Sequence, residues 1–118
     1  MSNSSTIIEA HPREDEYADY VSPSPHPGEH LREDYLSDYG LTAETLAEAM
    51  GLSDAQPVRD LLAERLDLTA DMALRLGKLF NQSPDLWAGL QAGHDLSKAA
   101  IAKREELARI RPLSAQAA

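Results

Sequence analysis

The sequence predicts an all-α fold: a bundle of five helices preceded by a flexible N-terminal arm. Signals for helix starts and stops recur from residue 29 onward, and the apolar residues between them follow the spacing of one helix face. No stretch shows the alternation of apolar and polar residues that marks a strand, and no repeat of fixed period is present. A sheet is therefore not expected.

Composition narrows the class of protein. The chain has 118 residues, 20 acidic and 11 basic side chains, a net charge of −9 and no cysteine. This length fits one domain of about 100–150 residues, and the lack of cysteine excludes disulfides, thiolate metal sites and a cysteine nucleophile. No apolar run approaches the roughly 20 residues of a membrane helix, and no secretory signal is expected. We expect a cytoplasmic protein without membrane contact, and its acidity argues against indiscriminate nucleic-acid binding.

Charge and proline divide the chain into three regions. Residues 1–30 hold six acids and one base, a net charge of −5, and four of the seven prolines. Because each proline removes an amide donor and restricts the preceding residue, residues 1–25 are predicted to form an acidic, flexible arm. A helical domain is expected at 26–96, and a charged C-terminal helix and tail at 97–118. The arm is either a solvating tail or a segment that docks on a basic partner or competes with DNA for the protein's few cations.

Glycines bound the first two helices. The first is predicted over Glu29–Tyr39, with Gly40 as its stop. Thr42 can N-cap the second, which ends at Gly51. The residues that these two helices turn inward are predicted to be Leu31, Tyr35, Leu36, Leu46, Ala47 and Met50.

The start of the third helix has two interpretations. Ser53 can cap it, with Gln56 three residues on as the capping-box partner. Alternatively, Pro57 moves the start to Gln56 and Pro57, because proline is favoured at the first helical position. In both cases the apolar positions are Val58, Leu61 and Leu62.

Caps also define the last two helices. Thr69 caps the fourth, and Asn81 suits a left-handed conformation at its end. Ser83 and Pro84 open the fifth, whose charged continuation over Lys98–Ile110 is expected to project from the body. The predicted inward residues are Met72, Ala73, Leu76, Leu79 and Phe80 in the fourth helix and Leu86, Trp87 and Leu90 in the fifth. A solvent-facing ladder of Asp71, Arg75 and Lys78 is expected on the fourth.

The connection between the second and third helices points to a binding function. One helix ends at Gly51, a single apolar residue, Leu52, turns to the core, and the next helix follows. The small side chain of Ala47 allows close approach of the two helices. This is the spacing of a helix-turn-helix, in which a short glycine-containing turn joins two steeply crossed helices. A plain αα-corner, a common connection in small helical bundles, fits the same spacing.

Three blocks of sequence carry a resemblance to a known family. They are Pro25–Leu36, Leu68–Phe80 and Ser83–Gln91, the last followed by Asp95 and Leu96. In this order they resemble the HigA-type antitoxins, small helix-turn-helix proteins of the phage-repressor-like (XRE) class. The resemblance implies a phage-repressor-like bundle, a homodimer that binds operator DNA and represses its own operon, and a partner toxin of the HigB type, a ribosome-dependent messenger-RNA nuclease.

Within a helix-turn-helix, residues near the start of the third helix touch base edges in the major groove. Gln56 can bond adenine bidentately and Arg59 can bond guanine. The alternative is that Gln56 serves a capping box and Arg59 pairs with neighbouring acids. The expected DNA-binding residues are Ser53, Asp54, Gln56, Arg59 and Arg65.

The chain departs from the family pattern around this helix. Asp54 and Asp60 would face phosphates, and the basic, glycine-containing turn usual in the family is replaced by Ala63–Leu66, where Arg65 is the only cation. An alternative function is therefore a helix-turn-helix protein that acts only through protein–protein contact. For a dimer, the candidate interface residues are Trp87 and Leu90; a core position is the alternative for Trp87.

One motif points to another class of function. His26, Glu29 and His30 match the H-x-x-E-H zinc pattern. That chemistry needs both histidines on one helix, whereas Pro27 and Gly28 place them at a helix start. A small metal-dependent hydrolase is therefore the third and least favoured function. We expect no enzymatic activity, no metal site and no cofactor.

Overall fold

The computed structural model describes residues 20–115, so most of the predicted arm at 1–25 and the last three residues lie outside the described part. Within residues 20–115 every regular element is helical, which confirms the predicted all-α class. The chain divides into two compact units: one is Ser24–Asp95, and residues 20–23 and 96–115 belong to the other. The predicted division into an arm at 1–25, a domain at 26–96 and a tail at 97–118 stays a prediction.

The first helical run spans residues 27–39 in three parts: α3 (Pro27–Leu31), the π-helical turn η1 (Arg32–Leu36) and α4 (Ser37–Tyr39). It begins two residues before the predicted Glu29, because the His26 side chain accepts a hydrogen bond from the Gly28 amide and caps the run. Gly40 ends it with φ of 63°, as predicted. Leu31 is buried, and Tyr35 and Leu36 pack against the core.

Helix α5 (Ala43–Ala49) follows the predicted pattern. The Thr42 hydroxyl accepts from the Thr45 amide, and the Thr45 hydroxyl accepts in return from the Thr42 amide. Gly51 then turns the chain with φ of 78°, a left-handed conformation that glycine adopts without steric cost. Leu46, Ala47 and Met50 are buried, as expected.

Helix α6 (Gln56–Leu62) starts later than the Ser53 cap would place it, so that prediction is wrong and the later start is correct. Ala55 occupies the N-cap position, and the Asp54 carboxylate accepts from the Gln56 amide at 2.9 Å. A helix capped by Ser53 would hold Pro57 beyond its first turn, where the missing N–H costs a hydrogen bond. Starting at Gln56 avoids this loss, and Val58 and Leu61 are buried as predicted.

Helices α7 (Ala70–Leu79) and α8 (Pro84–Ala102) complete the bundle, and α9 (Arg104–Ala108) follows a break at Lys103. Counting residues 27–39 as one helix, the chain forms the five predicted helices between Pro27 and Ala102. Thr69 caps α7 and Asn81 is left-handed at φ of 56°, both as expected. Leu86 is the exception: it is 43% exposed, because Trp87, Leu90 and Gln91 form the inward face of α8.

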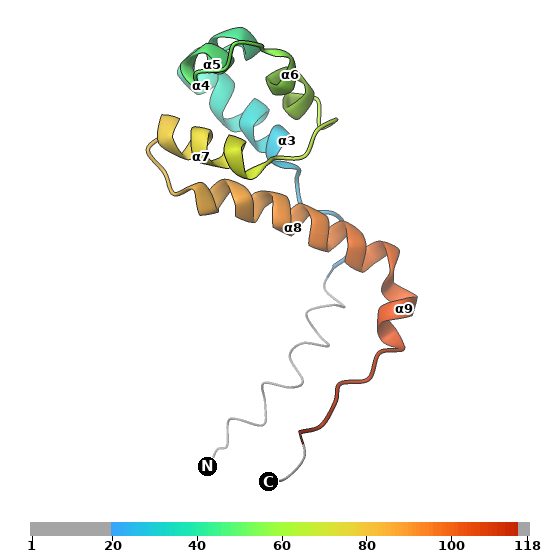
Figure 1. Ribbon diagram of the computed structural model, residues 1–118. Coiled ribbons are helices and arrows are strands. Elements are labelled where there is room, and N and C mark those ends of the chain that lie inside the picture. The colour runs from blue at the N-terminus through green and yellow to red at the C-terminus, as the bar shows by residue number, and fades with distance from the viewer. Residues whose placement is uncertain (1–19, 116–118) are drawn as a thin grey trace. The chain divides into compact units, whose positions relative to one another are not determined.

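One apolar core joins the elements of the Ser24–Asp95 unit. Its largest fully buried side chain is Trp87 of α8. In Figure 1, α3 lies beside α6, and α5, which precedes α6 in the chain, also packs against it. The buried apolar residues are Leu31, Leu46, Ala47, Met50, Val58, Leu61, Leu68, Met72, Ala73, Leu76 and Trp87. In the part of the chain that the structure describes, no helix is both long and apolar enough to cross a membrane.

Candidate nucleic-acid interface

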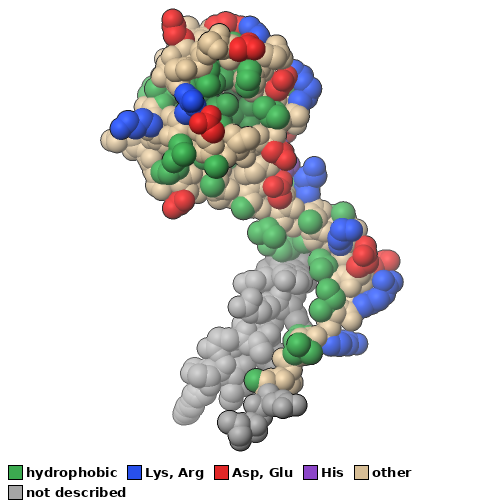
Figure 2. Space-filling model, viewed as in Figure 1, with side chains coloured by type: hydrophobic (Ala, Val, Ile, Leu, Met, Phe, Trp, Pro, Cys, Tyr) green, Lys and Arg blue, Asp and Glu red, His purple; other side chains and the backbone are tan. Residues whose placement is uncertain are grey.

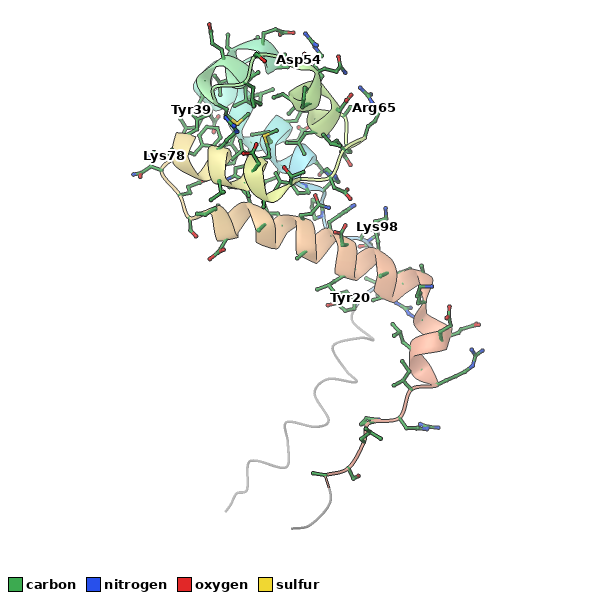
Figure 3. All side chains as sticks on the ribbon, in the orientation of Figure 1. Tyr20, Tyr39, Asp54, Arg65, Lys78 and Lys98 are labelled. Carbon is green, nitrogen blue, oxygen red and sulfur yellow. The ribbon has the colours of Figure 1, made fainter. Side chains whose placement is uncertain are left out.

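Helices α5 and α6 and the turn between them form a helix-turn-helix. Gly51 reverses the chain, Leu52 packs against the core, and α6 begins at Gln56 with Val58 and Leu61 facing inward. The inward face fixes α6 on the bundle and leaves its opposite face to solvent. Figure 3 shows Asp54 and Arg65 at the two ends of α6.

The structure brings the five predicted DNA-binding residues onto one exposed helix and its two flanks. Gln56 and Arg59 lie on α6, Ser53 and Asp54 precede it, and Arg65 follows it; all five are exposed. The arrangement is that of a reading helix whose side chains are accessible to base edges. The DNA-binding roles of these five residues stay predictions.

The polar side chains of α6 are already paired with one another and with α5. Arg59 donates through Nη2 to Glu44 Oε2 at 2.5 Å and through Nη1 to Gln56 Oε1 at 3.2 Å. Gln56 Nε2 donates to Asp60 Oδ1 at 2.9 Å, and Arg65 Nη2 donates to the same oxygen at 2.8 Å. We call these five side chains, Glu44, Gln56, Arg59, Asp60 and Arg65, the reading-helix network.

Both carboxylates of the reading-helix network are held in their charged form. The hydrogen bond from Arg59 lowers the pKa of Glu44 below its ordinary value, with help from a backbone hydrogen bond. Hydrogen bonds from Arg65 and then from Gln56 lower the pKa of Asp60. At neutral pH the network therefore carries two negative and two positive charges, and its net charge is zero.

The whole unit is acidic. Residues 24–95 hold 13 Asp and Glu against 5 Lys and Arg, a net charge of −8. All four arginines of this unit, Arg32, Arg59, Arg65 and Arg75, form salt bridges with carboxylates. Figure 2 shows acidic and basic side chains interspersed on the visible face of the unit, without a continuous basic patch. The net charge of this unit therefore does not favour general attraction to phosphates.

Two contacts from the first helical run hold α6 in place, and both involve the last turn of α6. Gly28 lies so close to α6 that a Cβ on it would stand 1.9 Å from the Leu61 carbonyl oxygen. Arg32 donates to the Leu62 carbonyl and, at 3.3 Å, to the Glu64 carboxylate. Glu64 has φ of 62°, so the chain leaves α6 through a left-handed residue other than glycine.

Sequence reasoning missed three residues of this site. Glu44 lies 15 positions before Arg59, and Arg32 lies 30 positions before Leu62, so no local pattern joins either pair. The sequence predicts only that Gly28 lies at a helix start. Its role as a contact point for α6 depends on the packing of two helices, which spacing along the chain does not reveal.

The H-x-x-E-H histidines serve intrachain contacts. His26 is 4% exposed; its Nδ1 caps α3, and its Nε2 lies 3.7 Å from Asp67 Oδ1. His30 Nδ1 lies 2.7 Å from Asp34 Oδ2. Among residues 20–115, no group of three or more His, Asp or Glu is arranged to hold a metal ion. The two rings thus face different partners, unlike the converging pair that zinc chemistry requires.

Trp87 lies in the core of the single chain. It has no exposed surface, and its Nε1 donates to Gln82 Oε1 at 3.0 Å, while Gln82 Nε2 donates to the Tyr35 hydroxyl at 2.8 Å. Trp87 therefore cannot contact a second chain directly and can contribute to a dimer interface only by packing under residues that are exposed. Leu90 keeps some exposed surface. The dimer interface at Trp87 and Leu90 stays a prediction.

Comparison with known proteins agrees with this fold. No protein-family model matches the chain. Virulence-associated protein I of Dichelobacter nodosus is 39% identical over 95 residues, which are 80% of this chain and 86% of that protein. Antitoxin HigA-1 of Vibrio cholerae is 33% identical over 86 residues, 73% of this chain and 80% of the antitoxin. The solved structure of Pseudomonas aeruginosa antitoxin HigA with the higBA promoter superimposes with a TM-score of 0.71 at 35% identity, covering 77% of this chain and 99% of that one.

The fold and the exposed α6 define a helix-turn-helix protein. The chain belongs to the HigA family of antitoxins, as its sequence blocks predict. Its relatives are antitoxins and helix-turn-helix transcriptional regulators, and it is accordingly a binding protein and not an enzyme.

Proposed function

We propose that this chain is an antitoxin that binds the operator of its own operon and neutralises a toxin of the HigB type. The observation that carries the operator-binding part is the position of Gln56 and Arg59 on the exposed face of α6, in a helix-turn-helix whose relative is solved with promoter DNA. The toxin part is supported by family membership. A cytoplasmic location is part of this proposal, because operator DNA lies in the cytoplasm.

Operator binding is proposed to involve a homodimer. Two copies related by a two-fold axis present two α6 helices to half-sites about one DNA turn, roughly 34 Å, apart. Leu90 is the proposed contact residue, supported from beneath by Trp87. Sedimentation equilibrium is expected to give about twice the chain mass of 12.9 kDa. The Leu90→Ala variant, which shortens the side chain without placing a charge against the core, is expected to shift toward one chain mass while keeping its helical circular dichroism.

Fluorescence anisotropy with DNA from upstream of the gene tests operator binding. The wild-type chain is expected to bind this duplex at least tenfold more tightly than a scrambled duplex, and the affinity should fall steeply with salt. Gln56→Ala and Arg59→Ala should each lose about tenfold in operator affinity, the cost of about one bidentate base contact. Lys78→Ala is the control, because Lys78 lies on the side of the unit away from Arg65 (Figure 3). Equal affinity for both duplexes would refute operator binding.

Co-expression tests the toxin partner separately. Cells that express the proposed partner, a toxin of the HigB type, are expected to resume growth when the wild-type chain is supplied. The Arg59→Ala variant is expected to restore growth equally well, because the proposed reading residues touch DNA and not the toxin. If the chain rescues growth but discriminates no operator, the protein acts through protein–protein contact alone.

A further inference from the structure

The charges of the reading-helix network are paired within the network, but Gln56 and Arg59 keep hydrogen-bond donors and acceptors that are free to bond DNA. Gln56 gives one lone pair of Oε1 to Arg59 and one N–H of Nε2 to Asp60. An amide has two N–H donors and an oxygen with two lone pairs, so one donor and one acceptor remain for an adenine edge. Arg59 uses one N–H on each terminal nitrogen and keeps three of its five donors. The network can therefore read base edges without coming apart.

The same pairing opposes contact between the network arginines and DNA phosphates. A phosphate attracts a guanidinium by charge, and each arginine of the network already faces a carboxylate. Glu44 and Asp60 also repel phosphates directly. Contact of Arg59 or Arg65 with the backbone of any DNA must displace or overcome a charge that stays ionised at neutral pH. The carboxylates thus penalise sequence-independent contact more than base contact.

We propose that Glu44 and Asp60 are specificity-determining residues, which hold Arg59 and Gln56 in position for base edges and keep Arg59 and Arg65 from binding phosphates of unrelated DNA. This inference rests on the proposed operator binding. It assigns a role to Glu44 and to Asp60, and from the sequence Asp60 only counts against DNA binding. Low affinity for random DNA is then a built-in property of the helix, and the operator is selected by the ratio of two affinities.

Neutral variants of the two acids test this proposal. Glu44→Gln and Asp60→Asn are expected to raise affinity for a scrambled duplex about three- to fivefold, while operator affinity rises less, so the ratio of the two affinities falls. The salt slope of scrambled-DNA binding should steepen by about one phosphate contact, close to 0.9. Glu48→Gln is the matched control: Glu48 is exposed one turn after Glu44 on α5, and its removal should leave the ratio unchanged.

A charge-preserving variant separates positioning from net charge. Glu44→Asp keeps the negative charge but shortens the side chain, so the 2.5 Å contact with Arg59 is lost. If Glu44 positions Arg59, the affinity ratio falls in this variant too; an unchanged ratio in Glu44→Asp, Glu44→Gln and Asp60→Asn would overturn the proposal. Circular dichroism checks that each variant is folded. Failure of operator binding itself is a distinct result, since it appears in the wild-type chain as equal affinity for the two duplexes.

Discussion

Arg32, in the π-helical turn of the first run, donates a hydrogen bond to the backbone carbonyl of Leu62, the last residue of α6. Carbonyls at the end of a helix lack partners within the helix, and a cation there also interacts favourably with the helix dipole. The same guanidinium bonds Glu64, the left-handed residue that leads the chain away. One side chain thus fixes both the end of the reading helix and the turn after it.

The Arg32→Ala variant is therefore expected to loosen the end of α6. Loss of the bond to Leu62 should lower the free energy of unfolding by about 1 kcal/mol. Amide hydrogen exchange in the last turn of α6 should accelerate about fivefold or more, while the amides of α7 change only in line with global stability. Lys78→Ala, which also removes one positive charge, is the control. Equal acceleration in both helices would show that Arg32 acts only on overall stability.

Gly28→Ala is expected to be destabilising because the new methyl group would stand 1.9 Å from the Leu61 carbonyl oxygen. One of the two backbones must move, at a cost of about 1–3 kcal/mol in the free energy of unfolding. Gly93→Ala in α8 is the matched control, since a Cβ there meets nothing within 4 Å. It should instead stabilise the helix by roughly 0.5–1 kcal/mol. Urea unfolding measures both, and effects of the same sign would contradict the backbone contact.

Gln82→Ala is expected to leave the indole N–H of Trp87 and the hydroxyl of Tyr35 without their present partner. A buried donor without an acceptor costs about 1–3 kcal/mol, so the free energy of unfolding should fall by that amount. Tyr35→Phe removes only the outer bond and should cost less. Trp87 is the single tryptophan of the chain, so its fluorescence follows the change directly. A larger loss for Tyr35→Phe than for Gln82→Ala would contradict this order.

The salt bridges of Glu44 and Asp60 predict a pH dependence. Both pKa values are lowered in the folded chain, from ordinary values of 4.5 and 3.8. A lowered pKa contributes stability above the unfolded-state pKa, and this contribution is lost as the pH falls through the folded-state pKa. The stability difference between wild type and Glu44→Gln should therefore stay constant from pH 8 to about pH 5.5 and shrink below about pH 4.5. Urea unfolding across this range checks it; a difference that already shrinks at pH 6.5 would exclude Glu44 as its source.

Local chemistry predicts most of the fold. Thr42 and Thr69 cap helices and Gly40 ends one, because each acts on backbone groups within a few residues. The start of α6 is ambiguous in the sequence because Ser53 is able to cap a helix, whereas Pro57 favours a later start; the helix begins at Gln56, with Ala55 at the N-cap position. The sequence wrongly predicts that Leu86 faces inward, because two consecutive residues of a helix lie about 100° apart and Trp87 takes the buried position.

The site was predictable only in part. The turn at Gly51 and Leu52 locates α6, and hence the exposure of Gln56 and Arg59. The pairing of Arg59 with Glu44 follows from how α5 and α6 cross, and no spacing along the chain encodes that angle. The sequence alternative in which Arg59 pairs with neighbouring acids describes its present contacts, whereas base contact by the same side chain stays a prediction.

The approach of Gly28 to Leu61 also limits how such a protein can diverge. Two backbones in direct contact leave no space for a side chain between them, so α6 cannot be re-angled by small substitutions at this crossing. A relative that recognises a different operator is then expected to differ in the outward side chains of α6, while the packing of α6 on the first helical run stays the same. Gly28 thus fixes how α6 packs on the bundle, whereas the outward side chains of α6 remain free to vary.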